Sequence, residues 1–193
     1  MAARPGRGPA RREGVAARLA PEPTRERGAT VLHLADPADL DHARMLARYD
    51  AVMELALDAL ERTFVETDGS WAERIHAAIG QLLGLAATNP REAWLCTIEV
   101  FDAGARGLER HDRSMARFQQ LCAAGYSEAG VPIPSRLMPQ IAAGAVFELI
   151  RSHADERRLE VLPEALPTAA LIVLSPIVGR EEALRVAGST STS

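Results

Sequence analysis

The chain has 193 residues, 47% of them apolar and 25% charged, and its formal net charge is −4. This length and composition are typical of one globular domain, and the many alanines and leucines, which lose little freedom in a helix, predict an all-helical fold. The longest strongly apolar stretch, residues 169–178, is well short of the roughly 20 residues that span a bilayer, which argues against a membrane protein. All 22 basic residues are arginine, so the number of arginines alone carries no functional information.

The two cysteines, Cys96 and Cys122, lie in apolar helical sequence and lack the close spacing of a zinc site or a redox pair. We expect both to be reduced core residues, as in cytoplasmic proteins. Arg11 and Arg12 are not followed by an apolar stretch, so the sequence predicts no export signal. Together these features predict a cytoplasmic protein.

Residues 1–38 form the first predicted region, and its charge differs from that of the rest of the chain. Residues 1–28 carry seven arginines and three glutamates, a net charge of +4, which leaves −8 for the remaining 165 residues. Frequent proline and glycine and few sizeable apolar side chains leave too little surface to bury, so we expect a disordered basic tail. The alternative is an arm that neutralises DNA phosphates without reading sequence.

About six helices are expected within residues 39–179, because apolar residues recur there at intervals of three and four. Capping signals define several boundaries: Ser70 and Glu73 have the spacing of a capping box, and Asn89 precedes a proline as an N-cap. Residues 180–193 are predicted to be a tail. The predicted helices span residues 39–67, 71–88, 90–103, 108–124, 135–156 and 163–178.

The last predicted helix, residues 163–178, is apolar on nearly all sides. A helix of this kind must be buried on most sides. In a chain of this size a second copy of the protein buries such a helix more easily than the chain's own fold does. The sequence therefore indicates an oligomer.

Several short segments follow one another in a fixed order through residues 40–179. They read ARYDAVM at 47–53, NP at 89–90 leading into LCTIEV at 95–100, LERHD at 108–112, MARF at 115–118, AGAVFEL at 143–149, LPEALP at 162–167 and LSPIVG at 174–179. Their order and spacing resemble the ligand-binding domain of TetR/AcrR-type transcriptional regulators over some 140 positions. The resemblance implies a helical body that dimerises through its last two long helices and holds a small-molecule cavity among the preceding ones.

The same family carries an amino-terminal three-helix head whose helix-turn-helix binds DNA. Residues 1–38 contain no amphipathic helix of useful length and no turn of the usual kind, so this head is not recognisable in the sequence. Two interpretations stay open. The chain is a TetR-like regulator or its sensing domain, or it is a headless sensor that does not bind DNA itself and pairs with a related regulator.

The resemblance places the cavity between the first, third, fourth and fifth long helices. Their apolar and aromatic side chains predict a small, mostly apolar effector, although each residue could equally be an ordinary part of the core. Trp94 and Phe101, seven apart on one predicted helix, share a face and are the pair that the sequence favours most as ligand contacts. The predicted ligand-binding residues are Met53, Leu57, Trp94, Ile98, Glu99, Phe101, Phe118 and Phe147.

Glu99 and Asp102 lie three apart in an otherwise apolar predicted helix. If they are buried, each must be paired or protonated, because an isolated carboxylate in apolar surroundings is costly. Glu99 is therefore expected either to orient a cationic or hydrogen-bonding ligand or to pair with an arginine such as Arg106.

For dimerisation, a run of small residues at 142–145 allows helices to approach closely, and the apolar face of the last helix supplies area. Two helices from each subunit then form a four-helix interface in a homodimer. The predicted interface residues are Ile141, Gly144, Ala145, Leu149, Ala170, Leu171, Leu174 and Ile177.

No catalytic set is predicted, because the sequence contains neither a nucleophile elbow of the G-x-S-x-G type nor a glycine-rich phosphate loop. A metal site would need two or three of the five scattered histidines to converge with a carboxylate, and helix capping explains the one local cluster, Asp39, Asp41 and His42, better than metal binding. We therefore predict no enzyme activity, no cofactor and no metal.

Overall fold

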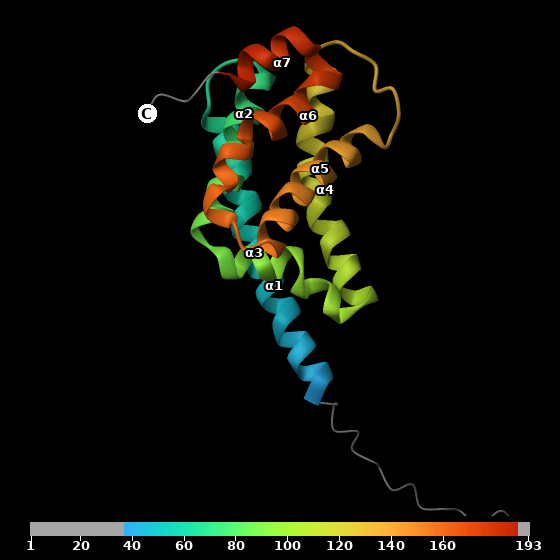
Figure 1. Cartoon of the computed structure of the whole chain (residues 1–193). Coiled ribbons are helices and arrows are strands. Elements are labelled where there is room, and N and C mark those ends of the chain that lie inside the picture. Colours follow the sequence, from blue (N-terminus) through green and yellow to red (C-terminus); the bar gives the residue numbers. More distant parts are fainter. Residues whose placement is uncertain (1–36, 189–193) are drawn as a thin grey trace, which may run out of the picture. The chain divides into compact units, whose positions relative to one another are not determined.

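The computed structural model describes residues 37–188, so the predicted tail at 1–38 lies almost wholly outside the described residues. The described part contains seven α-helices, two 3-10 helices and no strand, which confirms the predicted all-helical class (Figure 1). These elements are α1 (Pro37–Glu66), α2 (Trp71–Thr88), α3 (Pro90–Thr97), η1 (Glu99–Ala103), α4 (Ala105–Glu128), α5 (Met138–Asp155), η2 (Leu159–Ala165), α6 (Leu166–Val178) and α7 (Arg180–Ala187).

The capping signals were predicted correctly at α2 and only in part at α3. Ser70 and Glu73 form the predicted capping box: the Ser70 Oγ accepts from the backbone N–H of Glu73, whose carboxylate accepts from the Ser70 N–H at 2.9 Å. Pro90 begins α3 as expected. The Asn89 side chain does not cap α3, however, because its Nδ2 donates instead to the Leu85 carbonyl at the end of α2.

The predicted helix at 90–103 breaks at Ile98, whose backbone leaves the helical region with φ −130°. The chain continues as the 3-10 turn η1 and then reverses at Gly104, which has φ +60°. Gly107 permits this turn, because a Cβ at that position would lie 1.8 Å from the Val100 carbonyl oxygen. Close backbone approach between η1 and α4 therefore shortens α3.

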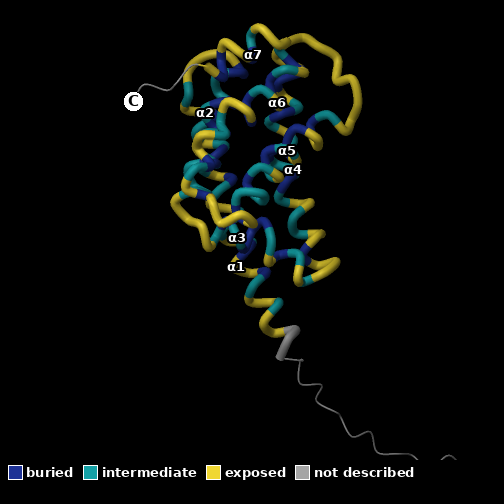
Figure 2. The backbone as a smooth tube through the Cα atoms, viewed as in Figure 1, coloured by how far each residue is buried: buried dark blue, intermediate teal, exposed yellow. Residues whose placement is uncertain are grey.

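Helix α6 packs against α2, α5 and α7 (Figures 1 and 2). Ala170, Val173 and Leu174 are completely inaccessible to solvent, and Ile177 is 5% exposed. The chain's own fold thus buries one face of α6, whereas Ile172 on the other face is 39% exposed, so burial of that outer face by a second copy stays a prediction. Small residues on the inner face, Ala169 and Ala170, allow the neighbouring helices to come close there.

The stretch Leu159–Val178 is, by length and composition alone, apolar enough to cross a membrane, with a mean hydropathy of 1.8 over its most apolar 18 residues. It extends the strongly apolar residues 169–178 toward the amino terminus through η2. Of those 18 residues, 33% are buried inside the fold. The buried ones, such as Val173 and Leu174, belong to the main hydrophobic core.

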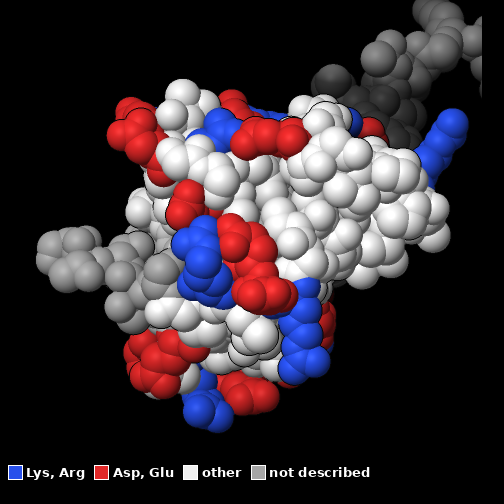
Figure 3. All heavy atoms as spheres, turned by 90° about the horizontal axis from the view of Figure 1, so that it is seen from above, with Lys and Arg blue, Asp and Glu red and all other residues white. Residues whose placement is uncertain are grey.

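The helical domain continues beyond the predicted boundary at residue 179. Residues assigned to a tail form α7, whose Ala183 and Val186 are fully buried. Arg185 donates to Glu182 at 2.6 Å and to Glu73 of α2 at 3.3 Å. Figure 3, which looks onto this end of the bundle, shows acidic and basic side chains next to one another. Helix α7 therefore contributes buried side chains to the core and an ion pair to α2.

Candidate ligand-binding cavity

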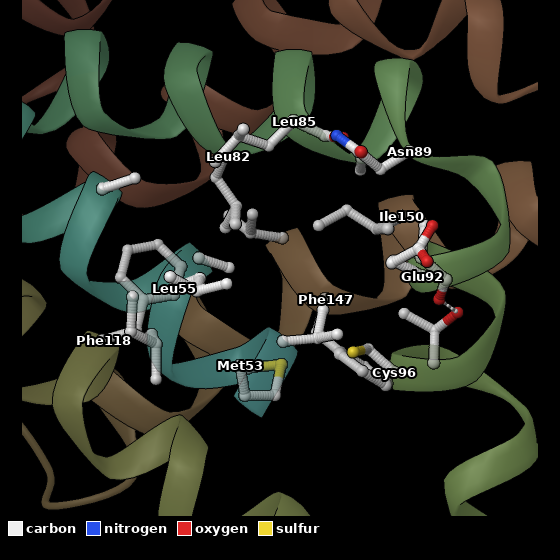
Figure 4. Close-up of a pocket in the computed structure, with 18 of the residues that line it drawn as sticks. Met53, Leu55, Leu82, Leu85, Asn89, Glu92, Cys96, Phe118, Phe147 and Ile150 are labelled. Atoms are coloured by element: carbon white, nitrogen blue, oxygen red, sulfur yellow. Dashed lines mark hydrogen bonds between the residues drawn. The ribbon is translucent and has the colours of Figure 1, made fainter. Parts of the chain in front are cut away.

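An apolar cavity of about 320 Å³ lies inside the bundle, and all five helices from α1 to α5 contribute to its walls (Figure 4). Its described lining contains mostly aliphatic and aromatic side chains: Val52, Met53, Leu55, Ala56, Leu57, Ala59, Leu82, Leu85, Ala86, Ala93, Met115, Phe118, Val146, Phe147 and Ile150, together with Asn89, Glu92, Cys96 and Thr97. Leu55, 72% exposed, and the exposed Asn89 mark where the cavity opens to solvent.

Four of the eight predicted ligand-binding residues line this cavity: Met53, Leu57, Phe118 and Phe147. They come from α1, α4 and α5, three of the four helices that the sequence placed around the site. In Figure 4 Met53 and Phe118 face the same space as Phe147. The structure therefore brings together residues that are up to 94 positions apart in the chain.

The other four predicted residues lie elsewhere. Trp94 and Glu99 line a separate hollow beside the end of α5. Ile98 packs against the main core, and Phe101 packs in a smaller cluster around Tyr49. Trp94 and Phe101 do not share a helical face, because α3 ends at Thr97, between them.

The carboxylates at the predicted third helix are also placed differently from the expectation. Glu99 and Asp102 are both exposed, since they lie on the 3-10 turn η1 rather than inside a long buried helix. The requirement that each be paired or protonated does not apply to exposed carboxylates. Neither residue lines the apolar cavity.

Helix α2, which was not predicted to line the site, supplies one wall of the cavity through Leu82, Leu85 and Ala86. The recurrence of these apolar residues along α2 identifies a buried face, but it does not distinguish a cavity wall from packed core. Cys96 was predicted to be a core residue; it is 7% exposed and lines the cavity. Burial raises the pKa of the Cys96 thiol to about 12, so the thiol is protonated at neutral pH.

An aromatic cluster supports the cavity wall behind Phe147. The His111 ring lies 4.4 Å from the Phe147 ring, and Phe101 lies 5.2 Å from His111 and 6.3 Å from Phe147, all measured between ring centroids. Burial lowers the pKa of His111 below 6.5, so its imidazole is neutral at pH 7. Phe101 thus contributes to the site from behind its wall, without lining it.

Ion pairs hold α1 against its neighbours on both sides of the cavity. Arg117 of α4 contacts three carboxylates of α1: Glu61 and Asp58 at 2.7 Å and Glu54 at 3.2 Å. These acidic residues follow one another at helical spacing next to the apolar face that carries Met53. Ion pairs as well as apolar packing therefore hold α1, which forms this wall, against α4.

On the other side, Arg48 of α1 donates to Glu92 of α3 at 2.6 Å. This hydrogen bond from Arg48 lowers the pKa of Glu92, so its carboxylate is ionised at neutral pH. Both side chains are partly exposed, 41% for Arg48 and 35% for Glu92, which makes the pair a modest contributor to stability. Its position matters more, because Glu92 lines the cavity.

No group of three or more His, Cys, Asp or Glu side chains that could hold a metal ion occurs among the described residues. Comparison of the chain with known protein families, with curated proteins and with solved structures gives no match. Its function is therefore inferred from the cavity and from the sequence.

Proposed function

We propose that the chain is the ligand-sensing, dimerising part of a TetR-like transcriptional regulator of the cytoplasm, with a small, mostly apolar effector. The observation that carries this proposal is the apolar cavity of about 320 Å³ between α1 and α5. Its volume lies at the lower end of the range of ligand pockets, about 300 to 1,000 Å³. An unfilled apolar cavity costs packing energy, so a molecule that fills it stabilises the folded chain.

Helix α1 connects the cavity to the proposed output. Its residues Met53 and Leu57 line the cavity, and its first turns extend beyond the other helices (Figure 1). A ligand that binds one arrangement of α1 more tightly than another shifts the population between the two. In a TetR-like regulator the DNA-binding head precedes this helix, so α1 is the proposed route from effector to DNA.

The proposed homodimer uses the outer faces of α5 and α6. Ile141 on α5 is 57% exposed, and Ile172 on α6 is 39% exposed. Gly144, three residues after Ile141 on α5, is also exposed. Among the predicted interface residues, Ala145, Leu149 and Leu171 are half-buried at the edge of this surface, whereas Ala170, Leu174 and Ile177 are buried in the chain's own core. The buried residues offer no area to a partner, so the surface is smaller than predicted.

Displacement of a fluorescent probe tests the ligand site. N-phenyl-1-naphthylamine, a neutral apolar probe, is expected to bind the full chain saturably with increased emission. Ala56 lines the cavity, and Ala56→Phe fills part of it and is expected to abolish binding. Ala51→Phe, on the exposed side of the same helix, is the matched control and should bind as the parent does. Equal binding by the two variants would contradict the assignment of this cavity.

Retardation of DNA from the chain's own upstream region tests the regulatory output. The regulator proposal expects sequence-specific retardation by the full chain, weakened or strengthened by cavity ligands. Retardation that is indifferent to sequence and is lost at higher salt reports phosphate neutralisation only. Ligand binding without specific retardation would contradict a directly DNA-binding regulator and support the headless sensor.

A further inference from the structure

The polar side chains of the cavity gather at one end. Among the described lining residues, Asn89, Glu92 and Thr97 come from α3 and from the residue just before it. In Figure 4 Asn89 and Glu92 lie at the opposite end from Phe118. A ligand in this cavity therefore meets hydrogen-bonding groups at one end and apolar surface over the rest of its length.

The donors of Asn89 are already used. Its Nδ2 donates to the Leu85 carbonyl at 2.9 Å and to the Thr88 Oγ1 at 3.0 Å. Because the Leu85 carbonyl can only accept, the nitrogen of the Asn89 amide must face it. The Oδ1 of Asn89 is then the atom left for a ligand, and it is an acceptor.

Thr97 is in the same situation. Its hydroxyl donates to the Ala93 carbonyl at 2.7 Å, inside α3, and the side chain is buried. A hydroxyl has one proton, so what Thr97 still offers toward the cavity is an oxygen lone pair.

Glu92 is the third acceptor. An ionised carboxylate accepts and cannot donate. Arg48 occupies one of its oxygens, Oε1, at 2.6 Å and is not itself part of the described lining. Arg48 is thus paired with Glu92, and the described lining of the cavity includes no arginine.

We propose that this cavity selects amphipathic molecules with an apolar body and a hydrogen-bond-donating head, an amine or an alcohol, and that the head binds between Asn89, Glu92 and Thr97. A carboxylate head would place its oxygens against three acceptors, one of them charged, at a cost in binding. Asn89 is exposed, so a head at this end also keeps contact with water. This inference rests on the proposed ligand-binding function and specifies which ligand class the same cavity takes.

Three eight-carbon compounds that differ only in the head test this selection: octylamine, octan-1-ol and octanoate. Each competes with N-phenyl-1-naphthylamine for the full chain at neutral pH. Octylamine and octan-1-ol are expected to displace the probe at concentrations about tenfold lower than octanoate. Octanoate that competes as well as the other two, or better, overturns the inference. If the probe itself does not bind, the proposed ligand site fails, which is a separate result.

Two substitutions locate the head. Glu92→Gln removes the charge and adds a donor. The ratio of octanoate affinity to octylamine affinity is therefore expected to rise by about tenfold. Glu99→Gln, the same change at an exposed carboxylate outside the cavity, should leave the order of the three compounds unchanged. Thr97→Val keeps the side-chain volume and removes one acceptor. It should lower the affinity for octan-1-ol by about fivefold relative to the affinity for the probe. An unchanged order in both Glu92→Gln and Thr97→Val overturns the placement of the head.

Discussion

Two regions of the bundle are packed differently. On the inner face of α6 the residues Ala169, Ala170, Val173 and Leu174 are completely buried, and the small side chains among them let neighbouring helices come close. Among the helices α1 to α5, lining side chains that include Ala56, Ala59, Ala86 and Ala93 leave about 320 Å³ open. Both regions are apolar, so apolar composition alone does not decide whether a region becomes closed core or a cavity. The size and shape of the facing side chains decide it.

The largest expected effect comes from placing a charge in the packed region. Leu174→Glu buries a carboxylate without a partner and is expected to lower the free energy of unfolding by more than about 4 kcal/mol, which leaves little folded protein. Ile141→Glu, at an exposed position, should keep the helical circular dichroism signal and convert the proposed dimer to monomer in light scattering. A Leu174→Glu variant that folds normally would contradict the packed region as described.

Enlarging an alanine should have opposite effects in the two regions. Ala170→Leu overfills the region around α6 and is expected to lower the free energy of unfolding by about 3 kcal/mol. Ala86→Leu extends into the cavity and is expected to change the stability little or raise it by about 1 kcal/mol. Denaturant unfolding followed by circular dichroism measures both. Similar losses in the two variants would show that the cavity has no room for a larger side chain.

Two helical glycines provide a smaller version of the same comparison. A Cβ at Gly125 would lie 2.4 Å from the Trp71 ring, whose Nε1 donates to the Leu121 carbonyl at 2.9 Å. Gly125→Ala is therefore expected to cost about 2 kcal/mol. A Cβ at Gly84 meets nothing within 4 Å, so Gly84→Ala should stabilise α2 by about 0.5 to 1 kcal/mol. Thermal unfolding of the two variants should shift in opposite directions, and a shift in the same direction would contradict the tight contact at Trp71.

The smallest expected effect is a dependence of stability on pH. Burial lowers the pKa of His76, on α2, and of His111, behind the cavity wall, below the ordinary 6.5. Below pH 6.5 the unfolded chain takes up protons at both positions that the folded chain does not, so the free energy of unfolding falls as the pH is lowered through this range. His76→Leu and His111→Leu should each reduce this slope in denaturant titrations. An unchanged slope in both variants would exclude the histidines as its source.

The local features of the fold were predictable from short segments. The capping box at Ser70 and Glu73, the proline that begins α3 and the glycine after α6 define helix ends through backbone geometry that depends on a few neighbouring residues. The cavity was predictable only in part. Met53 and Phe118 were identified as apolar residues on buried faces, but α2 was left out, because apolar periodicity does not show which helix a face meets.

The sequence by itself determined the all-helical class, most helix boundaries and the presence of several apolar faces, because these depend on side-chain propensity, capping and spacing along one segment. Only the tertiary structure decided that one face of α6 is buried by its own chain, that Trp94 and Glu99 lie away from the cavity, and that Asn89, Glu92 and Thr97 present acceptors at one end of it. Each of these outcomes depends on how side chains from distant segments fill space together, and no single segment carries that information.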